Sequence, residues 1–201
     1  FIEENIEGII KDIKAIVDIP SVKGPAEEGA PFGKEVRRAL DEALKIGKRM
    51  GFETVNCEDY LGYAQLNGKS EKYIGTIAHL DVVPAGNGWN TDPYDMVVKD
   101  GYLMGRGVID NKGPLILTFY LGKFFQELGE KLPYTLRMIA GCNEECGMED
   151  VEYYIHHYEE PVFLFTPDSE FPLCNGEKGR LCANFTSKHF EQGAILEFQG
   201  G

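Results

Sequence analysis

The segment "TIAHLDVVPAGNGW", residues 76–89, places a histidine and an aspartate on either side of one leucine, where a run of strand-forming residues ends. If the strand continues that far, His79 and Asp81 point to the same face, because strand side chains alternate with period two. An imidazole and a carboxylate at a strand end can form a metal site or an acid–base pair. They can also form a simple hydrogen-bonded strand terminus, so the rest of the chain must decide.

Further carboxylates occupy similar positions along the chain. Asp110 opens a predicted helix after "GRGVID", Glu144 and Glu145 follow a predicted strand, and Asp168 follows another. Taken singly, they are explained as a helix N-cap, a solvated pair and a turn former. Open α/β sheets, however, collect their active-site residues beyond the carboxyl ends of strands. The shared location therefore indicates one common site.

Carboxylates crowded at short range repel and raise one another's pKa values, and a divalent cation removes that repulsion. Zinc accepts imidazole nitrogen and carboxylate oxygen and leaves an open position for water in catalytic sites. Two ions about 3.5–4 Å apart, bridged by one carboxylate, would account for so many oxygen ligands. The water then needs a carboxylate base, which one glutamate of the adjacent pair could supply. The pattern predicts a metal-dependent hydrolase.

The elements that must position these residues follow from hydrophobic periodicity. We predict helices over residues 2–18, 33–50, 110–129 and 149–158, the third beginning at Asp110 or Asn111. We predict strands over 53–57, 61–66, 72–80, 134–142 and 161–168, of which 72–80 and 161–168 are buried, and a hairpin over 94–105 around Asp100-Gly101. Strands that alternate with helices predict a three-layer α/β/α domain with a mixed, largely parallel sheet.

Composition limits the possible partners. With 201 residues, the chain is one domain or one and a half, and its formal net charge of -13 argues against nucleic acid, whose phosphates demand Lys and Arg. No apolar run approaches the roughly 18–20 residues of a membrane span. Five cysteines, an odd count without zinc-knuckle spacing, favour reduced thiols in a cytoplasmic protein.

Three long motifs carry a resemblance to a known family. "AHLDVVPAGNGWNTDPYDMVVKDGYLMGRGVIDNKG", "NEECGMED" and "FTPDSEFPLCNGEKG" resemble, in this order, the signatures of the ArgE/DapE/aminoacylase/carboxypeptidase family of co-catalytic zinc hydrolases. The run "PDSEFPLCNGEKG" is most similar to PepV-type (Xaa-His or β-Ala-Xaa) dipeptidases. The resemblance covers essentially the whole chain.

This resemblance implies a two-zinc site. His79 is similar to the first zinc ligand of the family, Asp168 to the other ligand of the same ion, and Asp110 to the carboxylate that bridges both ions. Glu145 matches a ligand of the second zinc.

The resemblance also assigns the residues around those ligands. Glu144 matches the general base that deprotonates the bridging water, and Asp81 resembles the aspartate that orients and polarises His79. Gly105, Arg106 and Gly107 look like the turn that delivers Asp110, in which we expect Arg106 to brace the loop.

One departure concerns the final histidine ligand of the second zinc, which family members supply from the far end of the catalytic domain after an inserted lid domain. No segment here matches it, and His189 is not expected to replace it. His156 and His157 are expected on a surface helix, and Cys142 and Cys146 are expected to be buried or idle thiols rather than ligands.

The chain begins without Met and ends at "AILEFQGG", so we expect residues 1–201 to be the N-terminal portion of the catalytic domain, with 180–201 leading towards a lid that is absent. The predicted function is a zinc-dependent dipeptidase acting on small peptides, with little activity from this portion alone. The alternatives are an N-acyl-amino-acid deacylase or desuccinylase on the same scaffold, and a non-catalytic metal-binding domain. No nucleic-acid or membrane partner is predicted, and oligomeric state is left open.

Overall fold

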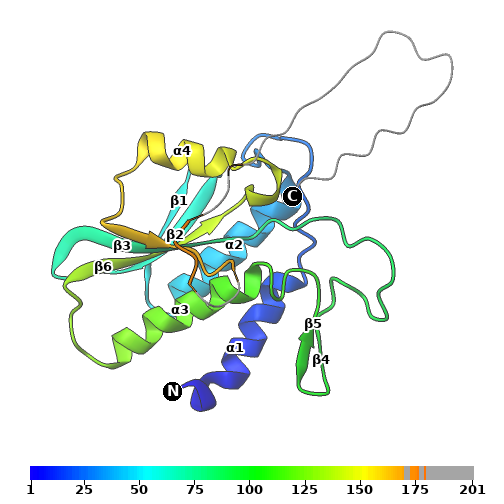
Figure 1. Ribbon diagram of the computed structural model, residues 1–201, viewed down its shortest axis with the longest axis horizontal. Coiled ribbons are helices and arrows are strands. Elements are labelled where there is room, and N and C mark those ends of the chain that lie inside the picture. The colour runs from blue at the N-terminus through cyan, green and yellow to red at the C-terminus, as the bar shows by residue number, and fades with distance from the viewer. Residues whose placement is uncertain (170–172, 177–178, 180–201) are drawn as a thin grey trace, which may run out of the picture. The chain divides into compact units, whose positions relative to one another are not determined.

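The computed structural model describes residues 1–169, 173–176 and 179. Its helices and strands all lie in the first of two compact units, Phe1–Ser169 (Figure 1). In chain order they are α1 (Ile2–Val17), α2 (Lys34–Arg49), β1 (Glu53–Cys57), β2 (Leu61–Leu66), β3 (Ser70–His79), β4 (Val97–Lys99), β5 (Tyr102–Met104), α3 (Lys112–Glu127), β6 (Tyr134–Gly141), the 3-10 helix η1 (Glu144–Cys146), α4 (Glu149–His157) and β7 (Phe163–Phe165).

The central sheet has the order β1-β2-β6-β3-β7. β1, β2 and β6 pair antiparallel, whereas β3 pairs parallel with β6 on one side and with β7 on the other. The sheet is mixed, as predicted, and two of these four pairings are parallel. Because β3, β6 and β7 run in the same direction, their carboxyl ends lie at one edge of the sheet, where the predicted site residues follow.

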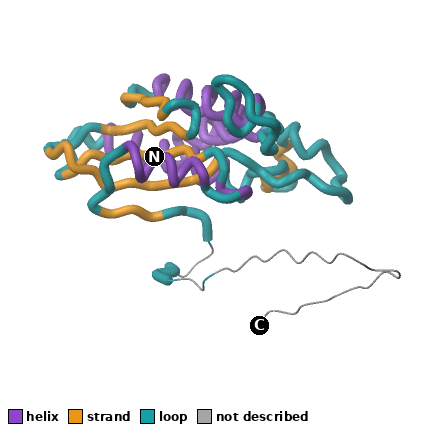
Figure 2. Tube along the Cα trace, turned by 90° about the horizontal axis from the view of Figure 1, so that it is seen from above, coloured by secondary structure: helices purple, strands orange, loops and turns teal. Residues whose placement is uncertain are grey.

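Helices cover both faces of this sheet, so the predicted three layers are confirmed. Helices α1, α2 and α3 bury one face, and α4 lies over the other (Figure 1). Figure 2 shows the same structure from above, with helices and strands in different colours. Strand β6 contributes to both cores with period two, since Leu136, Met138 and Ala140 belong to the larger core and Ile139 packs with Tyr154 of α4.

The prediction that the strand near residues 161–168 is buried is wrong. Strand β7 forms, but Phe163, Leu164 and Phe165 are all exposed. The reason is its place in the sheet, since β7 ends the strand order of the described residues and pairs with β3 alone. A short apolar run indicates a strand but does not say whether neighbours cover both of its faces.

In the described part of the chain, no helix combines the length and the apolar character needed to cross a membrane.

The packing of α3 on the sheet gives a stability prediction. Leu115 is fully buried, whereas Leu117, two residues further along the same helix, is 48% exposed. We expect Leu115→Ala to lower the free energy of unfolding by about 2–5 kcal/mol, because it removes buried methyl groups and leaves a cavity. Leu117→Ala, the matched control, should cost less than about 1 kcal/mol. Urea unfolding measures both, and equal losses would contradict the described packing.

Candidate metal centre

His79 is the last residue of β3 and is held at the carboxyl edge of the sheet. It pairs in register with Gly141 of β6, and its side chain is buried. Its Nδ1 lies 2.8 Å from the backbone oxygen of Asp81. Since a carbonyl oxygen can only accept, Nδ1 carries the hydrogen, and the neutral imidazole presents the lone pair of Nε2 to the site.

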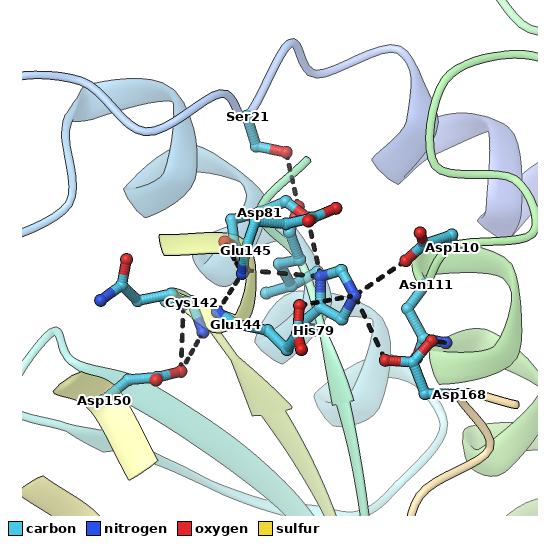
Figure 3. Close-up of polar contacts among 12 residues, drawn as sticks. Ser21, His79, Asp81, Asp110, Asn111, Cys142, Glu144, Glu145, Asp150 and Asp168 are labelled. Atoms are coloured by element: carbon cyan, nitrogen blue, oxygen red, sulfur yellow. Dashed lines mark hydrogen bonds and ion pairs between the residues drawn. The ribbon is translucent and has the colours of Figure 1, made fainter. Parts of the chain in front are cut away.

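Three carboxylates approach Nε2 of His79 (Figure 3). The nearest oxygens of Asp110, Asp168 and Glu144 lie 2.9, 3.5 and 3.9 Å from it. The structure thus brings together residues that are separated by up to 89 positions, as the strand-end argument predicted. The side chain of Asp110 is more than half exposed, so the site is open to solvent on that side.

A tight turn delivers Asp110 to this position. Gly107 has φ +90°, and its carbonyl accepts hydrogen bonds from the backbone N–H groups of Lys112 and Gly113. A Cβ at Gly113 would stand only 2.0 Å from the backbone oxygen of Val108, so the turn requires glycine there. The Asp110–Asn111 peptide bond is cis.

Asn111, which the sequence predicted only as a helix start, holds Asp168 in place. The buried Asn111, which is the N-cap residue of α3, donates from Nδ2 to Oδ1 of Asp168 at 2.8 Å and to the backbone oxygen of Pro167 at 3.3 Å. No residue pattern signalled this contact, because an asparagine at the start of a helix is already explained as an N-cap.

Asp81 connects the histidine to the glutamate pair. Glu144 and Glu145 lie in η1, which follows β6. Their backbone N–H groups donate to Oδ1 and Oδ2 of Asp81, each at 3.1 Å. The same Asp81 carboxylate has an oxygen 3.5 Å from Nδ1 of His79. The predicted proximity of His79 and Asp81 is confirmed. The contacts of Asp81 with the amides of Glu144 and Glu145 were not predicted.

The crowding of charges shifts the pKa values of the site. Burial raises the pKa of Glu144, Glu145 and Asp168, and neighbouring carboxylates raise each of them further. Burial lowers the pKa of His79, but the hydrogen bonds and charge of Asp81 and the charge of Asp168 outweigh it and raise the pKa to about 9. Without metal, His79 is therefore the cation that compensates these carboxylates.

The donor set suits a divalent transition metal. Ligand atoms of His79, Asp110 and Glu145 all lie within 4.8 Å of one another, and in the tetrahedral coordination of zinc they would be about 3.4 Å apart. This group takes Glu145 rather than Asp168 as the third ligand. Asp168 is nonetheless within 3.5 Å of Nε2, so both carboxylates are in reach. Imidazole and carboxylate ligands together fit zinc and related ions.

The remaining predictions near the site have mixed outcomes. Arg106 braces its loop as expected, since its Nη2 donates to the backbone oxygen of Ala85 at 3.3 Å and its guanidinium lies over the ring of Trp89. Cys142 is buried and Cys146 exposed, and neither is in the metal-binding group.

The other histidines are also placed. His156 and His157 are exposed on α4, as predicted. His189 lies outside the described residues.

Comparison with known proteins identifies the family. Residues 75–197, more than half of the chain, match the family described as peptidase family M20/M25/M40. The chain belongs to this peptidase family. The match confirms the resemblance carried by the sequence motifs, and it spans His79, Asp110, Glu144, Glu145 and Asp168.

Individual members of the family share both sequence and fold with this chain. The Beta-Ala-Xaa dipeptidase of Lactobacillus delbrueckii subsp. lactis is 36% identical over 190 residues, which are 93% of this chain and 40% of that relative. The crystal structure of human carnosine dipeptidase 1 superposes with a TM-score of 0.70 at 26% identity, covering 85% of this chain and 40% of that one. The chain thus spans less than half the length of these relatives.

A more distant structure supports the fold. The Bacillus subtilis YxeP protein, described as a dinuclear metal binding peptidase from the M20 family, has a TM-score of 0.54 at 17% identity and covers 80% of this chain and 42% of that one.

The raised pKa of His79 predicts how metal affinity depends on pH. A histidine binds zinc as the neutral imidazole, so zinc bound at His79 would have to displace the proton that the raised pKa of about 9 favours. We expect zinc affinity to rise by about tenfold per pH unit between about pH 6 and 8, measured by competition with a chelator at buffered zinc concentrations. His156→Gln removes an exposed histidine of α4 and should leave that slope unchanged. A pH-independent affinity would contradict the assignment of His79 as a ligand.

Proposed function

We propose that this chain is the N-terminal portion of the catalytic domain of a metal-dependent dipeptidase. The observation that carries the proposal is the convergence of Asp110, Glu144 and Asp168 on Nε2 of His79. Such a cluster at the carboxyl edge of a sheet suits hydrolysis by an activated water. The 36% identity to a Beta-Ala-Xaa dipeptidase supports short peptides as substrates.

We assign the ligands to two zinc ions. His79 and Asp168 would hold one ion, Glu145 the other, and Asp110 would bridge them. The support is geometric, because Asp110 is the carboxylate nearest to Nε2 of His79 and also belongs to one metal-binding group with Glu145. Bound zinc would polarise the peptide carbonyl and lower the pKa of water.

Glu144 is the proposed general base. Its carboxylate lies at the site, 3.9 Å from Nε2 of His79, and its pKa is raised by burial and by Glu145 and Asp168. A carboxylate whose pKa is raised towards neutrality takes a proton more readily from the attacking water and can pass it to the leaving amine. Asp81 fixes the Nδ1–H tautomer of His79 and the backbone of Glu144, so its proposed role is to orient both.

We also propose a cytoplasmic location. Its support is that Cys57, Cys142 and Cys146 are free thiols, which suit a reducing compartment.

The function is tested with the intact protein on two substrate panels, one of dipeptides that includes β-Ala-Xaa and Xaa-His sequences and one of N-acyl and N-succinyl amino acids. We expect zinc-dependent hydrolysis of the dipeptides, and hydrolysis of the acylated panel alone would make the protein a deacylase. Metal binding without turnover on either panel would indicate a non-catalytic domain.

Replacing each glutamate by glutamine distinguishes the proposed base from the proposed metal ligand. Glu144→Gln keeps the shape but removes the basic carboxylate, so we expect kcat to fall by roughly 10²–10⁴-fold while bound zinc stays constant. Glu145→Gln should instead lower the zinc content, measured by elemental analysis of the same preparations.

A matched control is available close by in the sequence. Glu149→Gln exchanges the exposed first residue of α4 and should change neither kcat nor zinc content. Equal zinc loss in the variants of Glu144 and Glu145 would show that the two roles are assigned the wrong way round.

A further inference from the structure

Four consecutive backbone N–H groups, those of residues 142–145, point at two buried carboxylates. The N–H groups of Cys142 and Asn143 both donate to Oδ2 of Asp150, at 2.5 and 3.1 Å. The next two in sequence, which carry the glutamate pair, donate to Asp81, as described above. Figure 3 shows Asp150 on the far side of this segment from His79.

Asp150 is placed for this role by its own surroundings. It is the second residue of α4 and is 1% exposed. Burial raises its pKa, and the N–H groups of Cys142, Val151 and Asn143 oppose that rise. A carboxylate in the first turn of a helix is also stabilised by the helix dipole. The side chain can therefore act as an acceptor for the segment that leaves β6.

The end of β6 is shaped to admit this carboxylate. A Cβ built on Gly141, the last residue of β6, would lie 3.0 Å from Oδ2 of Asp150 and 3.7 Å from Cβ of His79. Any larger residue at this position would push Asp150 away from the segment. The absence of a side chain at Gly141 thus fits the approach of Asp150.

Without Asp150, two buried N–H groups at the start of the segment would lose their acceptor. Buried donors are costly to leave unpaired, so the segment would move to find other partners. Asp81 accepts only from the N–H groups of Glu144 and Glu145, at the second half of the segment. If the first half lost its acceptor, that half could shift and carry the glutamates with it. The positions of the Glu144 and Glu145 side chains therefore depend on both carboxylates.

We propose that Asp150 is a positioning residue, which sets the Glu144–Glu145 segment by accepting hydrogen bonds from the backbone amides of Cys142 and Asn143. The inference rests on the proposed function for the roles of the two glutamates, whereas the amide contacts are independent of it. Asp150 itself touches neither substrate nor metal in this proposal. The sequence alone gave no sign of it, because an acidic residue in the first turn of a helix is common.

The test compares two variants in the intact, zinc-loaded protein. Asp150→Ala removes the acceptor, and we expect kcat and zinc affinity each to fall by roughly 10–100-fold with KM within about threefold, because such supporting contacts orient ligands and base. Asp150→Asn retains one oxygen, which can accept from both amides as Oδ2 does. We expect this conservative variant to restore kcat to within about threefold of the unmodified protein.

Asp12 supplies the matched control for loss of a buried carboxylate. It is 2% exposed and accepts from Arg49 and Tyr120 in the contact of α1 with α2 and α3, away from the site. Asp12→Ala should lower the melting temperature without changing the kcat of the folded protein. If Asp150→Ala behaves in the same way, with kcat and zinc affinity unchanged, Asp150 is structural and the inference is overturned.

Three further outcomes have a defined meaning. If Asp150→Ala does not fold, Gly141→Ala displaces the same carboxylate by a few tenths of an ångström and should lower kcat at constant KM; an unchanged kcat there overturns the inference. If Asp150→Asn is as impaired as Asp150→Ala, hydrogen-bond acceptance is not what matters, and the inference also fails. Absence of dipeptide hydrolysis in the unmodified protein would refute the proposed function, while the zinc affinities of the variants would still decide the inference.

Discussion

The arrangement of the site depends on Asp81, which joins the ends of two neighbouring parallel strands. Its backbone oxygen faces Nδ1 of His79 at the end of β3, and its carboxylate accepts from the amides of Glu144 and Glu145 beyond β6. Its neighbours are anchored as well, because Oγ of Ser21 donates to the backbone oxygen of Leu80 and the backbone oxygen of Ser21 accepts from the N–H of Val82. One fully buried residue therefore fixes both the tautomer of the imidazole and the backbone of the glutamate pair.

The same arrangement concentrates negative charge that the neighbouring side chains neutralise only in part. Asp110, Glu144, Glu145 and Asp168 are gathered around one imidazole, and the pKa values of three of them are raised. A protonated His79 compensates only part of this negative charge. A divalent cation would compensate more of it and would bind to oxygens that already face one another. The same crowding of negative charge thus makes the cluster suitable for binding a divalent cation.

Much of the fold could be predicted from local patterns. The amphipathic period of α1 and α2 set their ends to within one residue, and the position of His79 at the end of β3 followed from the strand pattern. The convergence of Glu144, Glu145 and Asp168 on His79 was predictable too, because they follow parallel strands whose carboxyl ends lie at one edge, and Asp110 was expected there at the start of a helix.

Other features leave no mark in the sequence. Asp81 and Asp150 contact residues 142–145 through backbone amides. Every residue except proline carries such an amide, so no residue pattern predicts these contacts. Phe163 and its neighbours read as a buried strand, but their exposure depends on the number of strands beside β7, which local hydrophobicity does not encode. Asn111 looked like a helix cap, and its contact with Asp168 became visible only in three dimensions.

Anomalous diffraction at the zinc absorption edge, from crystals of the intact zinc-loaded protein, shows directly whether this cluster binds the metal. We expect an anomalous peak about 2.0–2.2 Å from Nε2 of His79 and from a carboxylate oxygen of Asp110, with the present contact between these two residues opened by the ion. We also expect Nδ1 of His79 to keep its hydrogen bond to the backbone oxygen of Asp81. Zinc bound elsewhere, with His79 and Asp110 still in direct contact, would contradict the identification of this cluster as the metal centre.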